Sequence, residues 1–262
     1  MTHYKRFTML FAATIVTLFL STPSTEAEKI MSGRDLAQMV FDRDRGLNSA
    51  SDATMVLVSE KGNKHTRTFK NLRMVKDDLE TQLIRFTSPA DIEGTAFLTI
   101  EKPGWETDQF LYLPALRRTR RIVSSQKSSS FVNSDFTYED MERHAVDDYT
   151  YNIAGSATTA GLDCHILEIT PKAETVSQYA KTIIHIAKDS LVPLYGEYFD
   201  GKGTKIKRYK VLNLEKIQGI WTESAVQMED LSKKHQTYIK LQHIEYNTNI
   251  DASQLSRQAL EN

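Results

Sequence analysis

Serine, lysine and histidine residues are the first places to look for chemistry in this sequence. Ser124 and Lys127 have the Ser-x-x-Lys spacing of one class of serine acyltransferases, and a Ser-Asp pair at 134 and a Lys-Gly-Thr triplet at 202 follow it. That class requires its first serine to open a buried helix, whereas Ser124 lies in a serine-rich stretch after an expected strand. The spacing therefore favours a loop over a nucleophile.

Metal and cofactor chemistry have no clear signal either. His235 and His243 lie eight residues apart on one expected strand, too far from each other to share a metal, and no His-Glu-x-x-His motif occurs. No glycine-rich phosphate loop, dinucleotide fingerprint or nucleophile elbow is present. Cys164, the single cysteine, lies in the apolar run LDCHILEI, which favours a buried, inert thiol. We expect a protein that is not an enzyme, without metal or cofactor.

The start of the chain has the pattern of an export signal. Lys5 and Arg6 precede an apolar run over residues 8–20, which is about as long as a signal-peptide core and short for a membrane span. Small residues then occupy the positions of a cleavage site. This pattern predicts a cleaved signal peptide over 1–27 and a mature periplasmic domain over 28–262; an uncleaved membrane anchor is the alternative.

Net charge excludes one explanation of the arginine-rich stretch over residues 117–121. The chain has 33 Lys plus Arg against 34 Asp plus Glu, a formal net charge of −1, so no overall field attracts a polyanion. An exported protein also meets little nucleic acid. We therefore expect no nucleic-acid partner, and the arginines need another role.

Short strands dominate the elements that must position these residues. Ser32 and Asp35 cap an amphipathic helix expected over 32–45, and a helical stripe near the C-terminus predicts a short closing helix. Between them lie about a dozen stretches rich in β-branched and aromatic residues, separated by turn signals. The first five are expected at 52–60, 66–76, 80–88, 95–101 and 108–122. Without a linker, these favour a single curved antiparallel sheet or open barrel.

Several of these strands carry apolar residues on both faces. Met55 and Leu57 alternate with Val56 and Val58, for example. One face could pack on helices while the other lines a cavity. A sandwich filled by its own side chains is the alternative.

The stretch FLYLPALRRTRRIVSSQKSSSFVNSDFTYED, residues 110–140, resembles the outer-membrane lipoprotein-sorting proteins, the LolA-like family. It shares their Tyr-Leu-Pro strand, arginine cluster and Ser-Asp-Phe…Tyr-x-Asp element. A looser similarity extends to the RDRG end of the first helix and to IDASQLS near the C-terminus. The resemblance implies a mainly β protein with a few short helices: a single unclosed antiparallel β-barrel, capped by helices, that encloses a hydrophobic cavity.

The resemblance also implies a function. Such a protein is a monomeric periplasmic carrier that binds the acyl chains of lipoproteins or other lipids and shuttles them between the inner and outer membranes. Its partners would be an inner-membrane exporter, such as one of the resistance-nodulation-division type, and an outer-membrane acceptor. A lipid- or lipoprotein-sensing regulatory or accessory subunit of an envelope transporter is the alternative.

Two sets of residues are expected to form the site. Seven apolar side chains, which adapt to acyl chains of varied shape, would line the cavity: Met55, Leu57, Phe97, Phe110, Tyr112, Phe131 and Phe136. Ion pairs would latch a lid over it, between Arg117, Arg118, Arg120 and Arg121 and the acidic Asp135, Glu139 and Asp140. Partly exposed ion pairs contribute about 0–1 kcal/mol each, so they would hold a lid without locking it. The alternative is a solvated arginine edge that prevents strand-to-strand aggregation.

Overall fold

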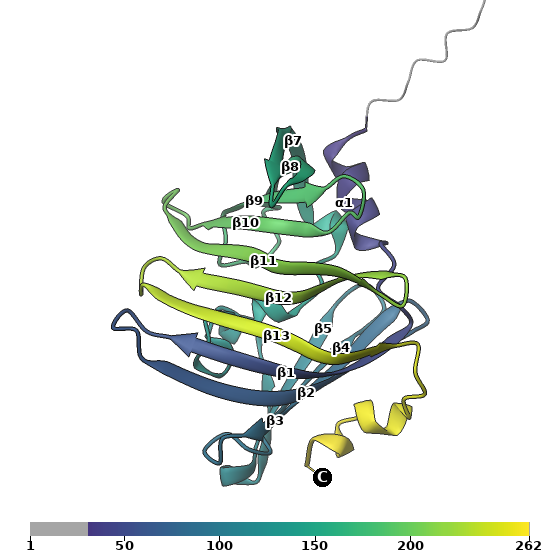
Figure 1. The fold of residues 1–262 in the computed structure, drawn as a ribbon, viewed down its shortest axis with the longest axis vertical. Coiled ribbons are helices and arrows are strands. Elements are labelled where there is room, and N and C mark those ends of the chain that lie inside the picture. The colour runs from purple at the N-terminus through teal and green to yellow at the C-terminus, as the bar shows by residue number, and fades with distance from the viewer. Residues whose placement is uncertain (1–30, 262) are drawn as a thin grey trace, which may run out of the picture. The chain divides into compact units, whose positions relative to one another are not determined.

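The computed structural model describes residues 31–261, which form one antiparallel sheet of thirteen strands with one short α-helix (Figure 1). The signal peptide expected at 1–27 lies outside these residues. Across the sheet the strands follow the order β6-β5-β4-β3-β2-β1-β13-β12-β11-β10-β9-β8-β7. The sheet curls, and its edge strands β6 and β7 do not pair with each other, so the barrel is unclosed. The predicted fold class is confirmed.

Two meanders make up this sheet, and they join where the first and last strands pair, for example at Met55 and Ile239. The first meander contains β1 (Asn48–Val58), β2 (Lys64–Lys76), β3 (Leu79–Ser88), β4 (Ala96–Glu101), β5 (Thr107–Leu113) and β6 (Arg118–Ile122). The second contains β7 (Tyr149–Thr159), β8 (Leu162–Pro171), β9 (Lys181–Ala187), β10 (Pro193–Phe199), β11 (Lys205–Ile217), β12 (Ile220–Asp230) and β13 (His235–Tyr246). Every neighbouring pair is joined by antiparallel hydrogen bonds.

The strand expected over 108–122 is in fact two strands. A short 3-10 helix, η1 (Pro114–Leu116), separates β5 from β6, and Arg117 follows it with a φ of 44°. Proline cannot donate a hydrogen bond to a neighbouring strand, and the left-handed residue after the turn reverses the chain. The arginine-rich stretch therefore forms the edge strand of the sheet.

Residues 123–148, which we call the crossover segment, carry the chain from one sheet edge to the other. The segment contains four 3-10 helices: η2 (Ser124–Gln126), η3 (Phe131–Asn133), η4 (Glu139–Met141) and η5 (Val146–Asp148). All six residues over 134–139 are buried although none belongs to a strand. The crossover segment thus passes along the inner face of the sheet and fills part of the interior.

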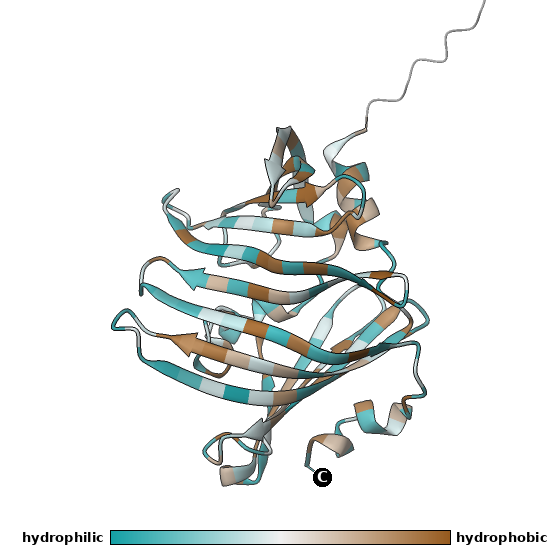
Figure 2. Ribbon diagram, in the orientation of Figure 1, coloured by the Kyte–Doolittle hydropathy of each residue, from teal (hydrophilic) through white to brown (hydrophobic). Residues whose placement is uncertain are grey.

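The main hydrophobic core lies where the crossover segment meets the first meander. Phe131 is 1% exposed, and its ring centroid lies 5.0 Å from that of Phe97 and 5.9 Å from that of Tyr138. Met55 and Leu57 from β1 belong to the same buried cluster. Buried and half-buried residues alternate along β1, whose C-terminal end is continuously hydrophobic (Figure 2). This half of the interior is filled by the protein's own side chains.

Short helices cover two other surfaces of the sheet. On the outer face of the first meander, Leu255 and Leu260 pack with Leu83 and Phe110. They belong to η6 (Ala252–Leu255) and η7 (Gln258–Glu261), so the expected closing helix is two 3-10 turns.

The other helix, α1 (Gly33–Phe41), packs against β7, β8 and β9. Ser32 and Asp35 form the predicted capping box. A Cβ at Gly33 would lie 2.8 Å from the backbone of Tyr151, so glycine permits the close approach to β7. The helix ends at Phe41 instead of at 45, because Arg43 and Arg45 leave the helix to form ion pairs described below.

We predict that Phe131→Ala lowers the free energy of unfolding by about 3–5 kcal/mol, the cost of truncating a fully buried phenylalanine. Urea denaturation would measure it. The control is Leu116→Ala, because Leu116 is 67% exposed and its truncation should change stability by about 0.5 kcal/mol or less. Equal effects of the two variants would contradict the filled core.

Candidate functional site

A cavity of about 600 Å³ lies between α1, the crossover segment and the inner face of the second meander. Ligand sites of this kind typically measure about 300–1,000 Å³. Its apolar wall consists of residues from six strands, β8 to β13, two of them tyrosines: Leu167, Ile169, Ile184, Ile186, Tyr198, Tyr209, Val226, Met228 and Ile239. A small molecule with substantial apolar surface fits such a wall.

Strand alternation explains why these residues face inward. Thr182, Ile184 and Ile186 follow one another at every second position of β9, and all three line the cavity. Ile184 is only half-buried, because the aromatic cluster of the crossover segment packs on the first meander and on β10 to β13, and does not include residues of β9. The second meander is therefore left with an unfilled apolar hollow.

Charged residues form the opposite part of the lining, which we call the polar end: Arg43, Arg45, Glu80, Glu101, Arg143 and Glu223. Arg45 Nη2 lies 2.7 Å from Glu80 Oε2, and Arg43 Nη2 lies 2.9 Å from Glu223 Oε1. Arg143 Nη1 lies 3.3 Å from Glu101 Oε2. The cavity is thus amphipathic, with ion pairs at one end and hydrocarbon along the rest.

The two carboxylates on β3 and β4 respond differently to this environment. Burial alone would raise the pKa of Glu80, but Arg45 and Arg73 outweigh it and the pKa is lowered. Arg73 lies beside the polar end, 3.2 Å from Glu80. For Glu101, burial dominates and raises the pKa despite the hydrogen bond from the Glu80 backbone and the charge of Arg143. Glu80 is therefore the carboxylate most firmly held in its ionised form.

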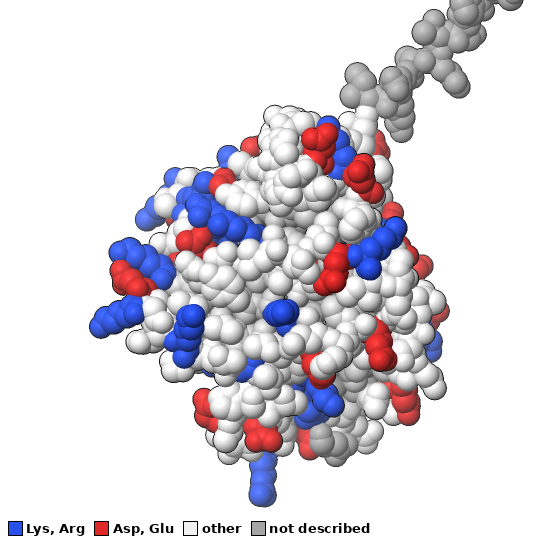
Figure 3. Space-filling model, viewed as in Figure 1, with Lys and Arg blue, Asp and Glu red and all other residues white. Residues whose placement is uncertain are grey.

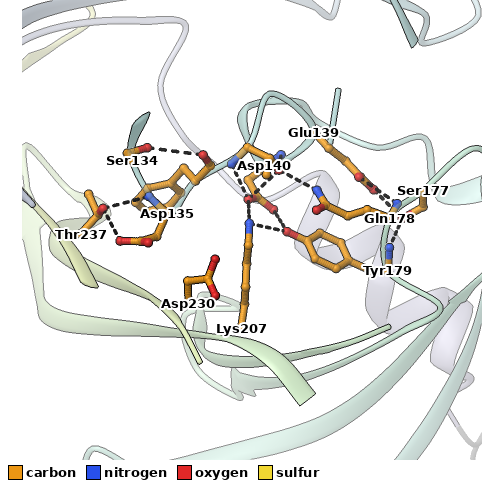
Figure 4. Close-up of polar contacts among 12 residues, drawn as sticks. Ser134, Asp135, Glu139, Asp140, Ser177, Gln178, Tyr179, Lys207, Asp230 and Thr237 are labelled. Carbon is orange, nitrogen blue, oxygen red and sulfur yellow. Dashed lines mark hydrogen bonds and ion pairs between the residues drawn. The ribbon is translucent and has the colours of Figure 1, made fainter. Parts of the chain in front are cut away.

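The crossover segment is fixed over the cavity by a buried polar network centred on Asp140 (Figure 4). Asp140 Oδ2 lies 3.0 Å from Lys207 Nζ, and Asp140 Oδ1 accepts a hydrogen bond of 2.7 Å from the Tyr179 hydroxyl. The Lys207 ammonium donates to the same hydroxyl at 2.9 Å. Burial, followed by the charge of Asp140, raises the pKa of Tyr179, which keeps the hydroxyl a neutral donor.

Two further acidic residues anchor the segment to other elements. Asp135 accepts a 2.6 Å hydrogen bond from the Thr237 hydroxyl and lies 2.7 Å from His235 Nδ1. Glu139 accepts hydrogen bonds from the Gln178 backbone, at 3.1 Å, and from the Ser177 hydroxyl. Breaking such buried contacts is costly, so the segment is a fixed wall of the cavity.

The ion pairs expected between the arginines and the acids of the crossover segment do not form in the described part of the chain. The prediction of a lid latch is therefore wrong. Asp135, Glu139 and Asp140 are occupied as described, and Arg121 Nε donates a 2.9 Å hydrogen bond to Asp108 of its neighbouring strand. Within residues 31–261, Arg117, Arg118 and Arg120 form no ion pair, and all four arginines are exposed. The turn at Pro114 places them on an edge strand, away from the buried acids. This exposure matches the alternative, a solvated edge.

The expected cavity residues also divide into three groups. Phe136 lines the cavity. Met55, Leu57, Phe97 and Phe131 pack together in the closed core beside it. Phe110 and Tyr112 belong to the outer cluster under the C-terminal turns. The face of β5 that carries them is the outer one, the reverse of the assignment expected from the sequence. The hollow thus lies in the other half of the sheet from the one predicted.

Sequence reasoning missed the polar end. Arg43 and Arg45 belong to the RDRG end of the first helix expected from the sequence, and nothing in that motif indicates a cavity. Glu80 lies on the inner face of β3, the face that also carries Gln82 and Ile84. A charged residue on the buried face of a strand is a signal that could have identified it. Arg143 had no distinguishing local signal, since its partners are distant in the sequence.

A search of solved structures finds close relatives of this chain. One is a DUF1329 family protein from Desulfovibrio piger, with 33% sequence identity and a TM-score of 0.82; the match covers 87% of this chain and 97% of that one. The chain belongs to the DUF1329 family. A family model described as an uncharacterized protein also matches residues 78–262. Among curated proteins, none is similar enough to this family member to count as a match.

Two further structures connect this DUF1329 family member to a wider fold. One, from Vibrio parahaemolyticus, is described as an outer membrane lipoprotein-sorting protein domain; it has 28% identity and a TM-score of 0.82 over 88% of this chain and 98% of that one. The other is a LolA superfamily protein from Nitrosomonas europaea, with 15% identity and a TM-score of 0.67 over 87% and 99% of the two chains. The resemblance stated from the sequence is confirmed, and the fold is LolA-like.

Residues 31–261 contain neither a membrane-spanning helix nor a metal-binding cluster. No helix in this range has the length and hydropathy needed to cross a membrane. No group of three or more His, Cys, Asp or Glu side chains there is arranged to hold a metal ion.

We predict that Asp140→Ala destabilises the DUF1329 family member by about 3 kcal/mol or more, because it leaves the Lys207 ammonium buried without its carboxylate. Adding Lys207→Met should recover most of the loss. The control is Asp147→Ala, which breaks an ion pair whose side chains are 55% and 76% exposed and should therefore change the stability far less. If the two single variants unfold at the same urea concentration, the contact of Asp140 with Lys207 does not stabilise the fold.

A second prediction concerns pH. The lowered pKa of Glu80 means that its ionised form stabilises the fold above the ordinary glutamate pKa of about 4.3, and that this contribution is lost as the pH falls through the lower folded-state pKa. Glu80→Gln should therefore cost about 3 kcal/mol at pH 7 and less at pH 3. Urea denaturation at both values tests this, and a difference that does not change with pH would refute it.

Proposed function

We propose that this protein is a periplasmic carrier, and not an enzyme, that holds acyl chains of lipoproteins or other lipids in its cavity. The observation that carries the proposal is the unfilled hollow of about 600 Å³ whose wall of Leu, Ile, Val and Met side chains faces the interior of the sheet. The LolA-like fold supports it. So does the related Vibrio structure, which is described as a lipoprotein-sorting domain.

The energetics of acyl chains explain why such a protein would be needed. Burying one CH₂ group is worth about 0.8 kcal/mol, so a sixteen-carbon chain exposes on the order of 13 kcal/mol of hydrophobic free energy in water. Unaided movement through an aqueous compartment is therefore negligible. A hollow lined by apolar side chains recovers part of this free energy while the lipid travels.

Because the crossover segment is fixed by buried contacts, we place lipid entry elsewhere in the carrier. The crossover segment serves as the floor that keeps the hollow from collapsing onto the filled core. Exchange with the proposed partners, an inner-membrane exporter and an outer-membrane acceptor, would then use another part of the cavity rim. The expected export signal at 1–27 would deliver the carrier to the periplasm.

Two adjacent residues of β9 provide a matched test of this proposal. Ile184 lines the cavity, whereas Ile183 points to the opposite face of the same strand. We predict that Ile184→Asn weakens binding of the uncharged fluorescent dye N-phenyl-1-naphthylamine by about tenfold, because a polar amide replaces apolar wall. Ile183→Asn should leave the affinity within about twofold. Fluorescence titration measures both.

Two outcomes would contradict the carrier proposal. One is that the unmodified protein binds neither the dye nor hexadecanoate. The other is that both variants weaken binding equally, which would place the dye outside the cavity.

A further inference from the structure

We propose that the cavity accepts an amphiphile with an anionic headgroup, a carboxylate or a phosphate, whose head binds at the polar end and whose tail lies along β8, β9 and β10. This inference rests on the proposed carrier function and adds the class and orientation of its ligand. It is carried by the guanidinium groups of the polar end, which hold hydrogen-bond donors facing an apolar hollow.

The first argument is the number of donors left without a protein partner. A guanidinium group carries five N–H donors. Among the described residues, Arg143 donates a side-chain hydrogen bond only to Glu101, from Nη1 at 3.3 Å, and Arg45 donates only to Glu80, from Nη2 at 2.7 Å. Both side chains line the cavity. Their remaining donors fit the several acceptor oxygens of a carboxylate or phosphate.

The second argument is the charge balance around the polar end. Four guanidinium groups, those of Arg43, Arg45, Arg73 and Arg143, are paired with three carboxylates, those of Glu80, Glu101 and Glu223. Glu80 is shared between two of the arginines. The charge of Asp42 also acts on Arg143, so the cluster as a whole is close to neutral. Its carboxylates already accept hydrogen bonds or ion pairs from the arginines, whereas guanidinium donors remain. An anionic headgroup would use these donors, whereas a cationic headgroup would compete with the arginines for the carboxylates.

The third argument is the rigidity of Arg143. Its guanidinium carbon lies 4.0 Å from the ring centroid of Phe41 and 5.6 Å from that of Trp105, and these two rings pack edge to face at 4.9 Å. The aromatic rings join the end of α1 to the turn between β4 and β5. A guanidinium group held in this way loses little freedom when it binds a ligand.

A buried hydroxyl at the same place supports the assignment. Thr99 is 6% exposed and lines the cavity, and its Oγ1 has no hydrogen-bond partner within residues 31–261. Buried polar atoms nearly always have a partner, so an unpartnered one beside a hollow points to a polar group that is supplied on binding. A headgroup oxygen at the polar end could accept a hydrogen bond from this hydroxyl.

The test compares ligands that share one tail. Hexadecanoate, hexadecyl phosphate, hexadecanol and hexadecyltrimethylammonium, each below its critical micelle concentration, would compete with N-phenyl-1-naphthylamine for the full mature chain. We expect the two anions to displace the dye at concentrations at least about tenfold lower than hexadecanol, the effect of one charge-assisted hydrogen bond. Hexadecyltrimethylammonium should be the weakest competitor.

Paired variants then assign the headgroup to Arg143. Arg143→Gln should reduce the preference of hexadecanoate over hexadecanol to about threefold or less while leaving hexadecanol unchanged. Glu101→Gln removes the acid that competes for Arg143, so it should strengthen hexadecanoate binding. If Arg143 and Glu101 had only a structural role, both substitutions would weaken the binding of hexadecanoate. Arg208→Gln, which removes an ion pair with Glu229 outside the cavity lining, is the control and should change neither ligand.

An intrinsic probe gives a second readout. Trp105 and Trp221 are the two tryptophans of the chain, so Trp221→Phe leaves Trp105 as the only one. Hexadecanoate should change the emission of Trp105 through its neighbour Arg143, and hexadecanol should change it much less.

The outcomes separate the two proposals. Equal competition by all four ligands, or a preference for the cation, overturns the headgroup inference and leaves the carrier proposal standing. Failure of every ligand to displace the dye overturns the carrier proposal itself.

Discussion

The structure depends on one constraint: the chain must pass from the β6 edge of the sheet to the β7 edge through the interior. A segment without strands has backbone groups to satisfy and must be held there by buried polar contacts. Asp135, Glu139 and Asp140 provide these contacts, each to a different part of the second meander or the loop before β9. The interior is thereby divided into a filled half and a hollow half.

This division accounts for the chemistry of both halves. On the filled side, Phe131 and Tyr138 complete an aromatic core with Phe97. On the hollow side, Ile184 and Ile169 pack against a small cluster around Leu36 and are only half-buried, so part of their apolar surface lines the cavity. Charged groups in the interior have polar partners, because an isolated charge there would be too costly. Guanidinium groups meet carboxylates at the polar end, and Asp140 meets Lys207 in the network that holds the crossover segment. On the surface, by contrast, both cations and anions occur across the face seen in Figure 3, and their numbers in the whole chain are nearly equal.

The fold could be predicted because its signals are local. Turn residues, β-branched runs and the Ser32–Asp35 capping box each determine structure within a few positions. The location of the cavity could not be predicted, because it depends on contacts between residues far apart, such as Asp140 with Lys207 and Asp135 with Thr237. Phe110 shows a second reason. A strand's alternation is visible in the sequence, but which of its sides faces inward is decided by what packs on it.

The pairing of β1 with β13 has a consequence for how the chain reaches this structure. Ser49 lies opposite Tyr246, so the two halves of the sheet are joined by residues from nearly opposite ends of the folded part. Such non-local pairing is slow to form, because a long loop must close before any contact stabilises it. Until the last strand is available, β1 exposes a free hydrogen-bonding edge that invites association with other chains. Newly made molecules therefore need protection from aggregation until the final strand is available for pairing.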